Sequence, residues 1–164
     1  MAKSWIMFLA LISLMYGSYA MSLSDVGKAC LFSKMSGVVL LDGKPVSGVR
    51  LVRTVDFSGK KTDETTSDDN GRFEFPPLYE RSIRNVLPQE FTAAQEVVAY
   101  YEGMEYQIWS AVKRKPDENA ESRGKPLVVT CELTSERKFI QVNNSPIFTI
   151  CTWDVEPDVI DTGF

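Results

Sequence analysis

The stretch from Ser36 to Pro77 limits the fold of this chain more than any other. It holds an apolar run from Val38 to Leu41, a second from Val49 to Val55, and then Phe73 and Phe75 at two-residue spacing. An Asp-Gly-Lys-Pro turn separates the first two runs, and an Asp-Asn-Gly turn precedes the phenylalanines. Because these turn residues favour positive φ or a fixed φ, the pattern predicts three β-strands joined by tight turns.

The rest of the chain continues this pattern. A hairpin around a Glu102–Gly103 turn is predicted between Gln95 and Lys113. Alternation along its strands places Val97, Ala99, Tyr101, Met104, Tyr106 and Ile108 on a core face, and Glu96, Val98, Tyr100, Glu105, Gln107 and Trp109 on the other. Further strands are predicted over 127–133, 138–142 and 147–153. Seven to eight short strands, with helical periodicity nearly absent, predict an all-β sandwich of immunoglobulin-like or transthyretin-like type.

The other segments are expected outside this framework. Residues 36–153 form the predicted domain, preceded by an irregular lead-in over 21–35 and followed by a flexible acidic tail over 154–164. Within the domain, we expect an exposed loop or edge at 57–67, a polar connector at 78–90 and a long charged surface loop at 113–125. The last of these has the sequence KRKPDENAESRGK, without apolar periodicity.

The first twenty residues have the layout of a secretory signal peptide. Lys3 precedes an apolar run from Trp5 to Tyr16, and small residues stand at Ser18 and Ala20. The run is short for a bilayer core of about 30 Å. We therefore expect cleavage after Ala20, export to the periplasm and no stable membrane insertion afterwards, with an uncleaved N-terminal anchor as the alternative.

Three cysteines, Cys30, Cys131 and Cys151, would then lie in an oxidising compartment, and three cannot all pair. We favour a disulfide between Cys131 and Cys151, because both lie in strand-like runs of the C-terminal half. The closed loop of about twenty residues would contribute roughly 3 kcal/mol. Cys30 is then left over, and we expect it to pack as a small apolar side chain.

The composition removes several classes of function. The chain has no histidine among its 164 residues, which excludes Ser-His-Asp catalysis and His-liganded zinc. Its formal charge is −4, and loss of the first twenty residues, whose only charge is Lys3, makes it −5. An acidic domain is a poor partner for nucleic acid. The acidic residues near Gly71 do not match a calcium loop, because Thr66 and Pro77 occupy ligand positions. We expect no enzyme activity, cofactor or metal.

The turn motifs are similar to those of a known domain family. The Gly-x-Pro-Val turn that begins at Gly43, and the Asp-x-x-Gly-x-Phe hairpin whose glycine is Gly71, resemble the carboxypeptidase regulatory-like, or prealbumin-like, domain. Over a longer span, 89–113 and the runs around Cys131 and Cys151 resemble small exported bacterial proteins of unknown function built on that domain. This resemblance implies a β-sandwich and supports the same cysteine pair, but it implies no activity.

These observations favour an exported binding module that contacts a protein partner. The expected contact residues are Val98, Tyr100 and Trp109 on the outer hairpin face, with Lys113, Arg114 and Lys115 in the charged loop. The most specific form of this hypothesis is an immunity or inhibitor protein against a toxin delivered to the periplasm. The alternative is a carbohydrate- or envelope-binding module that stacks sugars on Tyr100, Tyr106 or Trp109. The sequence leaves the oligomeric state open.

Overall fold

The structure is a computed structural model that describes residues 27–81 and 90–159. These residues form thirteen β-strands and one 3₁₀ helix, without an α-helix. The strands are β1 (Lys28–Phe32), β2 (Met35–Leu41), β3 (Lys44–Pro45), β4 (Arg50–Asp56), β5 (Lys60–Thr66), β6 (Arg72–Phe75), β7 (Leu78–Arg81), β8 (Ala93–Tyr101), β9 (Met104–Lys113), β10 (Leu127–Glu132), β11 (Lys138–Val142), β12 (Ser145–Thr149) and β13 (Cys151–Thr152), and the helix is η3 (Ala120–Ser122).

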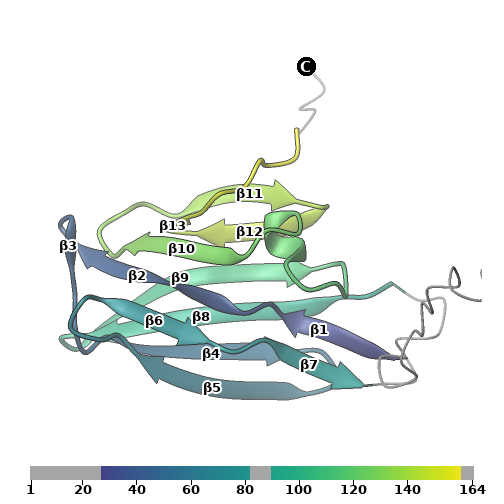
Figure 1. Ribbon diagram of the computed structural model, residues 1–164, viewed down its shortest axis with the longest axis horizontal. Helices are drawn as coiled ribbons and strands as arrows, with labels where there is room; N and C mark the ends of the chain where they lie inside the picture. The colour runs from purple at the N-terminus through teal and green to yellow at the C-terminus, as the bar shows by residue number, and fades with distance from the viewer. Residues whose placement is uncertain (1–26, 82–89, 160–164) are drawn as a thin grey trace, which may run out of the picture.

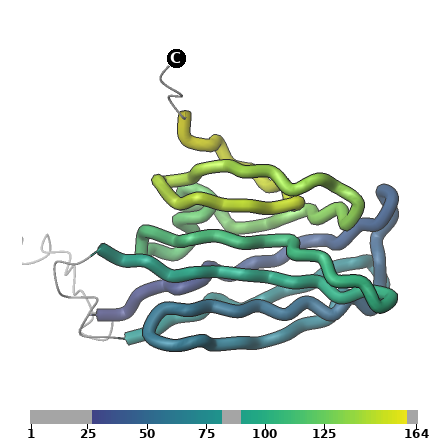
Figure 2. The backbone as a smooth tube through the Cα atoms, turned by 180° about the vertical axis from the view of Figure 1, so that it is seen from behind, coloured from purple at the N-terminus to yellow at the C-terminus, as the bar shows by residue number. Residues whose placement is uncertain are grey.

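The strands form two layers, which confirms the predicted all-β sandwich. Sheet C has six strands in the order β11-β12-β9-β8-β4-β5, and it makes up the rear layer (Figures 1 and 2). The front layer consists of sheet B, which contains β13, β10, β2, β3 and β6, and of the two-stranded sheet A, β1-β7. The strand segments outnumber the seven to eight predicted, because β3 and β13 have two residues each, β1 and β7 lie in segments expected to lack strands, and β5 forms in the segment expected to be an exposed loop or edge.

The predicted turns form where turn residues stand. Asp42 and Gly43, with φ of 51° and 75°, turn the chain between β2 and β3, and Glu102 and Gly103, with φ of 49° and 77°, turn it between β8 and β9. Glu132 holds the first of these turns, because its carboxylate accepts hydrogen bonds from the N–H groups of Asp42 (3.0 Å) and Gly43 (2.8 Å). These hydrogen bonds, together with those from Thr134, outweigh the effect of burial and lower the pKa of Glu132.

One parallel pair, β2 with β10, closes the front layer and depends on a glycine. Gly37 lies opposite Val129 in this pair. A Cβ atom at Gly37 would lie 2.0 Å from the carbonyl oxygen of Val129, which is much closer than atoms can approach. Only glycine therefore allows the two backbones to come this close.

The core lies between the layers and is fastened at the C-terminal side by a disulfide. Aromatic and aliphatic side chains from both layers fill it, among them Phe32, Leu51, Phe75, Trp109 and Ile147. Cys131 and Cys151 are directly opposed on β10 and β13 and form the predicted disulfide. Cys30 is buried and free, and burial raises the pKa of its thiol.

Two segments expected to lack strands contain them, so those two predictions were wrong. The lead-in contains β1, whose residues from Ala29 to Phe32 are buried, and the connector contains β7. The tail is attached as far as Asp158, whose N–H donates to the carbonyl of Gln141 (2.7 Å) and whose carboxylate pairs with Arg123. Tail residues beyond 159, the predicted signal peptide at 1–20, lead-in residues 21–26 and connector residues 82–89 lie outside the described residues.

Candidate functional site

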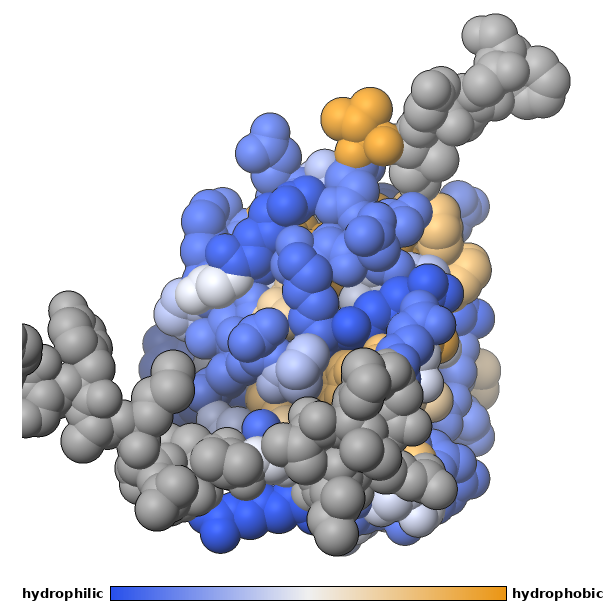
Figure 3. Space-filling view, turned by 90° about the vertical axis from the view of Figure 1, so that its right-hand side faces the viewer, coloured by the Kyte–Doolittle hydropathy of each residue, from blue (hydrophilic) through white to orange (hydrophobic). Residues whose placement is uncertain are grey.

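Sheet C has more strands than the other two sheets, and its outer face carries the candidate site. Cross-strand neighbours form a row over all six strands: Phe139, Phe148, Ser110, Glu96, Thr54 and Thr62. Side chains in such a row point to the same side of the sheet. Figure 3, which views the sandwich end-on, shows a mainly hydrophilic end with hydrophobic residues gathered along the edge where sheet C lies.

A shallow groove crosses this face along the row, and Thr54, Glu96, Ser110 and Phe148 of the row line it. Its floor carries small side chains from the central strands, namely Ala94 of β8 and Ser110 of β9. Pro146 and Phe148 form an apolar wall, whereas Asp56 and Lys60 stand on the opposite side. The groove therefore has one apolar and one charged wall, a combination that suits a ligand with both kinds of surface.

The apolar wall continues into an exposed aromatic pair. Phe139 and Phe148 are 48% and 44% exposed, and their ring centroids lie 5.0 Å apart. The guanidinium of Arg137 lies 5.7 Å from the centre of the Phe148 ring. Exposed aromatic rings beside an arginine are typical of the residues that contribute most to protein interfaces. We refer to Arg137, Phe139 and Phe148 as the aromatic edge.

Trp109 does not belong to this face, which corrects the predicted contact set. The hairpin register holds near the turn, where Ala99 pairs with Tyr106, but it shifts so that Val97 pairs with Trp109. Ile108 is therefore an extra residue, a β-bulge, and the bulge moves Trp109 to the core side. Trp109 is fully buried, and its ring packs against those of Phe32 and Trp153.

The other predicted hairpin contacts are only partly available. Val98 lies on the outer side but is 8% exposed. Tyr100 is half-buried, and its ring face is covered by the guanidinium of Arg50, 4.4 Å from the ring centre. Tyr106 is also half-buried, whereas Met104, expected in the core, is 59% exposed at the hairpin tip. Neither Trp109 nor Tyr100 thus presents a free ring face.

Lys113 also lies inside the protein, as part of a buried polar cluster. The loop expected on the surface folds inward at η3, and Glu121 is 2% exposed. Lys113 Nζ donates to Glu121 Oε2 at 2.8 Å and to Ser33 Oγ at 3.2 Å, and Ser33 Oγ donates to Glu121 Oε2 at 2.6 Å. The other half of the same carboxylate accepts a hydrogen bond from Gln95 Nε2 at 2.8 Å. We call Ser33, Gln95, Lys113 and Glu121 the buried cluster.

The cluster is a hydrogen-bonded network whose four side chains are almost completely buried. Trp109 Nε1 donates to Gln95 Oε1 (3.1 Å), the N–H of Asn119 donates to Ser33 Oγ (2.7 Å), and Trp153 Nε1 donates to the Glu121 carbonyl (3.2 Å). Burial raises the pKa of Glu121, but the Lys113 ammonium and the hydrogen bonds outweigh it and lower the pKa overall. Glu121 is therefore a buried carboxylate neutralised by a buried cation, which fixes the loop onto the core.

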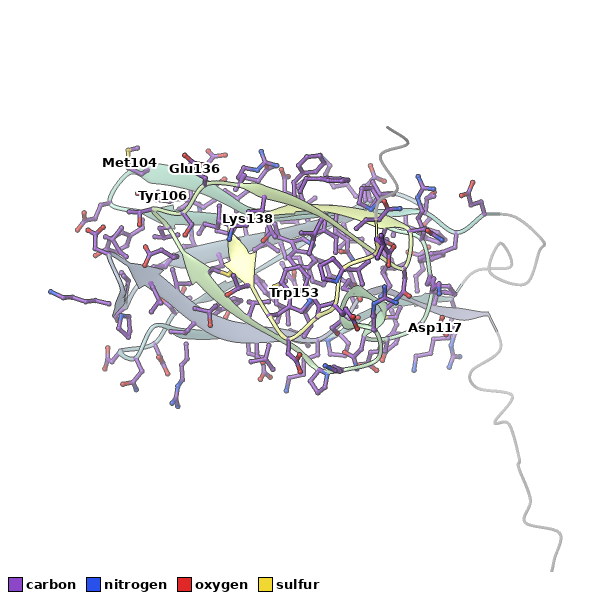
Figure 4. All side chains as sticks on the ribbon, turned by 90° about the horizontal axis from the view of Figure 1, so that it is seen from above. Met104, Tyr106, Asp117, Glu136, Lys138 and Trp153 are labelled. Carbon is purple, nitrogen blue, oxygen red and sulfur yellow. A yellow bond between two sulfur atoms is a disulfide. The ribbon has the colours of Figure 1, made fainter. Side chains whose placement is uncertain are left out.

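The remaining predicted residues, Arg114 and Lys115, lie on the surface. Arg114 pairs with Glu90 (3.7 Å) and Lys115 reaches Asn143 (3.5 Å). Figure 4 shows Asp117 of the same loop at one end of the molecule, and Met104 and Tyr106 at the other. The predicted contact residues therefore do not gather at one place: Tyr100 lies near the hairpin tip, Trp109 and Lys113 are internal, and Arg114 and Lys115 begin the loop.

Sequence reasoning missed the aromatic edge, although a signal was present. In the run from Lys138 to Val142, Phe139 alternates with Ile140 and shares its side with Gln141. That alternation places Phe139 on the polar side of its strand. The exposure of Phe148 could not be predicted, because its apolar neighbours Ile147 and Ile150 suggested a fully buried strand.

Fold and site together define a β-sandwich with an open sheet face. Within residues 27–81 and 90–159, no group of three cysteine or acidic side chains is arranged to hold a metal ion. No helix among them is long and apolar enough to cross a membrane.

The model of the family described as a domain of unknown function, DUF6795, matches residues 35–136, and the chain belongs to this family. No curated protein and no solved structure matches. The family match includes β5 and the buried Lys113–Glu121 pair, whereas all three residues of the aromatic edge lie beyond it.

Proposed function

We propose that this protein is an exported, non-enzymatic binding module that contacts a protein partner through the outer face of sheet C. The aromatic edge carries the proposal, because two phenylalanine rings in contact with each other are nearly half exposed, and exposed aromatic rings are enriched at protein interfaces. The groove beside them supplies small side chains, hydrogen-bonding groups and a charged wall. A protein surface offers the mixed chemistry that fits both parts.

The compartment belongs to the same proposal. A disulfide between Cys131 and Cys151 persists in oxidising surroundings, which supports an exported protein and, with the N-terminal signal layout, a periplasmic one. We also propose, from the turn motifs, that the domain is of the carboxypeptidase regulatory-like type.

The most specific form of the proposal is an immunity or inhibitor protein that neutralises a toxin delivered to the periplasm. Small size, an acidic charge and the absence of histidine chemistry from the sequence support it. Co-expression with the product of a neighbouring toxin gene tests this form. Survival of cells that make both proteins supports this form of the proposal. Death of cells in which the folded protein is present contradicts it.

A protein partner fits the surface better than a sugar does. A carbohydrate-binding module needs free aromatic faces for stacking, but Trp109 is buried, Arg50 covers one face of the Tyr100 ring, and Tyr106 is half-buried. The aromatic edge does not replace them, because its two rings are tilted by 50° to each other and form no common platform. A glycan array with the purified protein tests the alternative directly.

The decisive experiment compares two exposed apolar sites on opposite layers. The protein is purified from its own envelope with its partner, the partner is identified, and binding is measured by calorimetry with purified components. Phe139→Ser with Phe148→Ser should weaken binding at least tenfold. Val128→Ser is the matched control, because Val128 is 58% exposed on β10 of sheet B.

The affinities of these variants distinguish binding through sheet C from binding through sheet B. Equal affinity of the wild-type protein and the double variant overturns the proposal, and so does an equal loss with Val128→Ser. Far-UV circular dichroism and a thermal melt show whether each variant is folded. If the double variant is unstable, Arg137→Glu tests the same edge, because it reverses a charge there and keeps both phenylalanine rings.

A further inference from the structure

The edge strand β5 carries an unusual charge order. Its first five residues are Lys60, Lys61, Thr62, Asp63 and Glu64, so two cations and two anions are placed symmetrically about a threonine. β5 is the last strand of sheet C and lies at the lower border of the molecule in Figure 1. In the described part of the chain, nothing pairs with β5 on the side away from β4.

The backbone of β5 has hydrogen-bonding groups available on that open side. Ser67, directly after β5, donates from its N–H to Val49 (2.9 Å) and accepts at its carbonyl from Gly48 (3.0 Å). Ser67 therefore directs both groups toward the β4 side, and the direction alternates along a strand. By this alternation Lys60, Thr62 and Glu64 direct their N–H and C=O groups to the open edge.

We propose that β5 is a homodimer interface, at which two copies of the chain pair antiparallel about a two-fold axis through Thr62. In this register the two Thr62 residues exchange backbone hydrogen bonds. Lys60 then lies opposite Glu64 of the second copy, and Lys61 opposite its Asp63. Each cation meets an anion, and the two sheets C form one continuous sheet. Strand addition at an open edge is a common mode of association, and a two-fold axis makes it self-complementary.

The charges select both the partner and the register. Charged side chains on an edge strand usually prevent pairing, because most incoming strands leave them unmatched. A second copy in antiparallel orientation places an opposite charge across from each of them, including Lys60, which is in no salt bridge within the described part of its own copy. The neighbouring two-fold register, centred on Asp63, would place two Asp63 carboxylates opposite each other, and like charges in direct opposition are destabilising.

The pattern is held in place by contacts within each copy. Arg53, which is buried, binds the Asp63 carboxylate with two hydrogen bonds of 2.9 Å and 2.6 Å. Lys61 pairs with Glu80 at 2.5 Å. Glu64 pairs with Arg50 at 3.0 Å, and Lys60 has no salt-bridge partner among the described residues. A second copy would thus find most of these side chains already ordered, which lowers the entropy cost of association.

The opposite edge strand of sheet C, β11, is less open to pairing with a second copy. The edge of β11 is partly covered by the C-terminal segment, because the N–H of Asp158 donates to the carbonyl of Gln141. The carboxylate of Asp158 also accepts from the N–H groups of Asn143 and Asn144 at the end of β11. The two edge strands of sheet C therefore differ, and of the two only β5 has a charge order that matches a second, antiparallel copy of itself.

Charge exchange tests the interface in solution. The association of the wild-type chain is measured by sedimentation equilibrium over a concentration series. Lys60→Glu places an acid opposite Glu64, and Glu64→Lys places a cation opposite Lys60, so each variant should associate at least tenfold more weakly. An equimolar mixture of the two variants restores both opposite pairs and should form heterodimers. The double variant, Lys60→Glu with Glu64→Lys, should dimerise with itself.

Two further variants complete the design. Lys44→Glu is the matched control, since it makes the same charge change at an exposed position on β3 and should leave association unchanged. Thr62→Pro removes an N–H that faces the open edge, so the monomer should fold and the dimer should be lost. A wild-type chain that stays monomeric overturns the proposal. A dimer that persists in Lys60→Glu and Glu64→Lys overturns it too, as does a mixture that fails to recover association.

Discussion

Two highly charged stretches of the chain, 60–64 and 113–125, each contain oppositely charged pairs, but only the second contains a pair that is buried. Residues 60–64 are on the open edge of sheet C, where Lys60 and Glu64 are exposed. In the second stretch, Lys113 and Glu121 are almost completely buried and paired with each other. The difference teaches that the number of charges does not decide burial. Burial of a charged side chain depends on whether that side chain finds a complete set of partners inside the fold.

The largest effect should come from breaking the buried pair. Glu121→Ala leaves the Lys113 ammonium buried without its anion and removes the acceptor for Ser33 and Gln95. We expect a loss of about 3–5 kcal/mol in the free energy of unfolding, measured by urea denaturation. Glu64→Ala on β5 is the matched change at an exposed pair and should cost less than about 1 kcal/mol. Equal losses would contradict the comparison.

A double-mutant cycle sharpens the same contrast. Lys113→Met alone leaves a buried carboxylate without its cation, whereas Lys113→Met with Glu121→Gln removes both charges and keeps an acceptor for Ser33. The double variant should therefore be less destabilised than the sum of the single variants, by roughly 2 kcal/mol of coupling. Additive losses would show that the two side chains act separately.

Acid should remove the contribution of the buried pair. Because the pKa of Glu121 in the folded protein is lowered from its ordinary value of 4.5, its charged form stabilises the fold. That stabilisation is complete above the pKa of the unfolded chain and is lost as the pH falls through the folded pKa. The stability difference between the wild-type protein and Glu121→Gln should therefore shrink on acidification below about pH 4.5. A pH-independent difference between the two denaturation series would refute this assignment.

The smallest change in stability should come from a substitution on the exposed edge strand β5. In the monomer, Lys60→Ala removes a side chain that has no salt-bridge partner among the described residues, so the free energy of unfolding should change by less than about 0.5 kcal/mol. Thermal melts at low protein concentration measure this. A larger loss under those conditions would mean that Lys60 supports the fold of the monomer itself.

The hairpin of β8 and β9 shows how far alternation can predict a surface. The Glu102–Gly103 turn fixes the register correctly at Ala99 and Tyr106, because turn type determines pairing close to the turn. Beyond the bulge at Ile108 the alternation is displaced by one residue, and Trp109 changes sides. A bulge has no reliable sequence signature, so the predicted contact set failed at this position.

The sequence alone determined the all-β class, most of the apolar strands, the main turns and the cysteine pair. Period-two apolar runs and turn residues are local signals, and Cys131 and Cys151 lie in strand-like runs of the same half of the chain. Only the tertiary structure decided which charges are buried, which aromatic rings are exposed and which edge is open. Those properties depend on neighbours distant in sequence: Ser33, Gln95 and Lys113 reach Glu121 from three different segments, and no local pattern specifies their meeting.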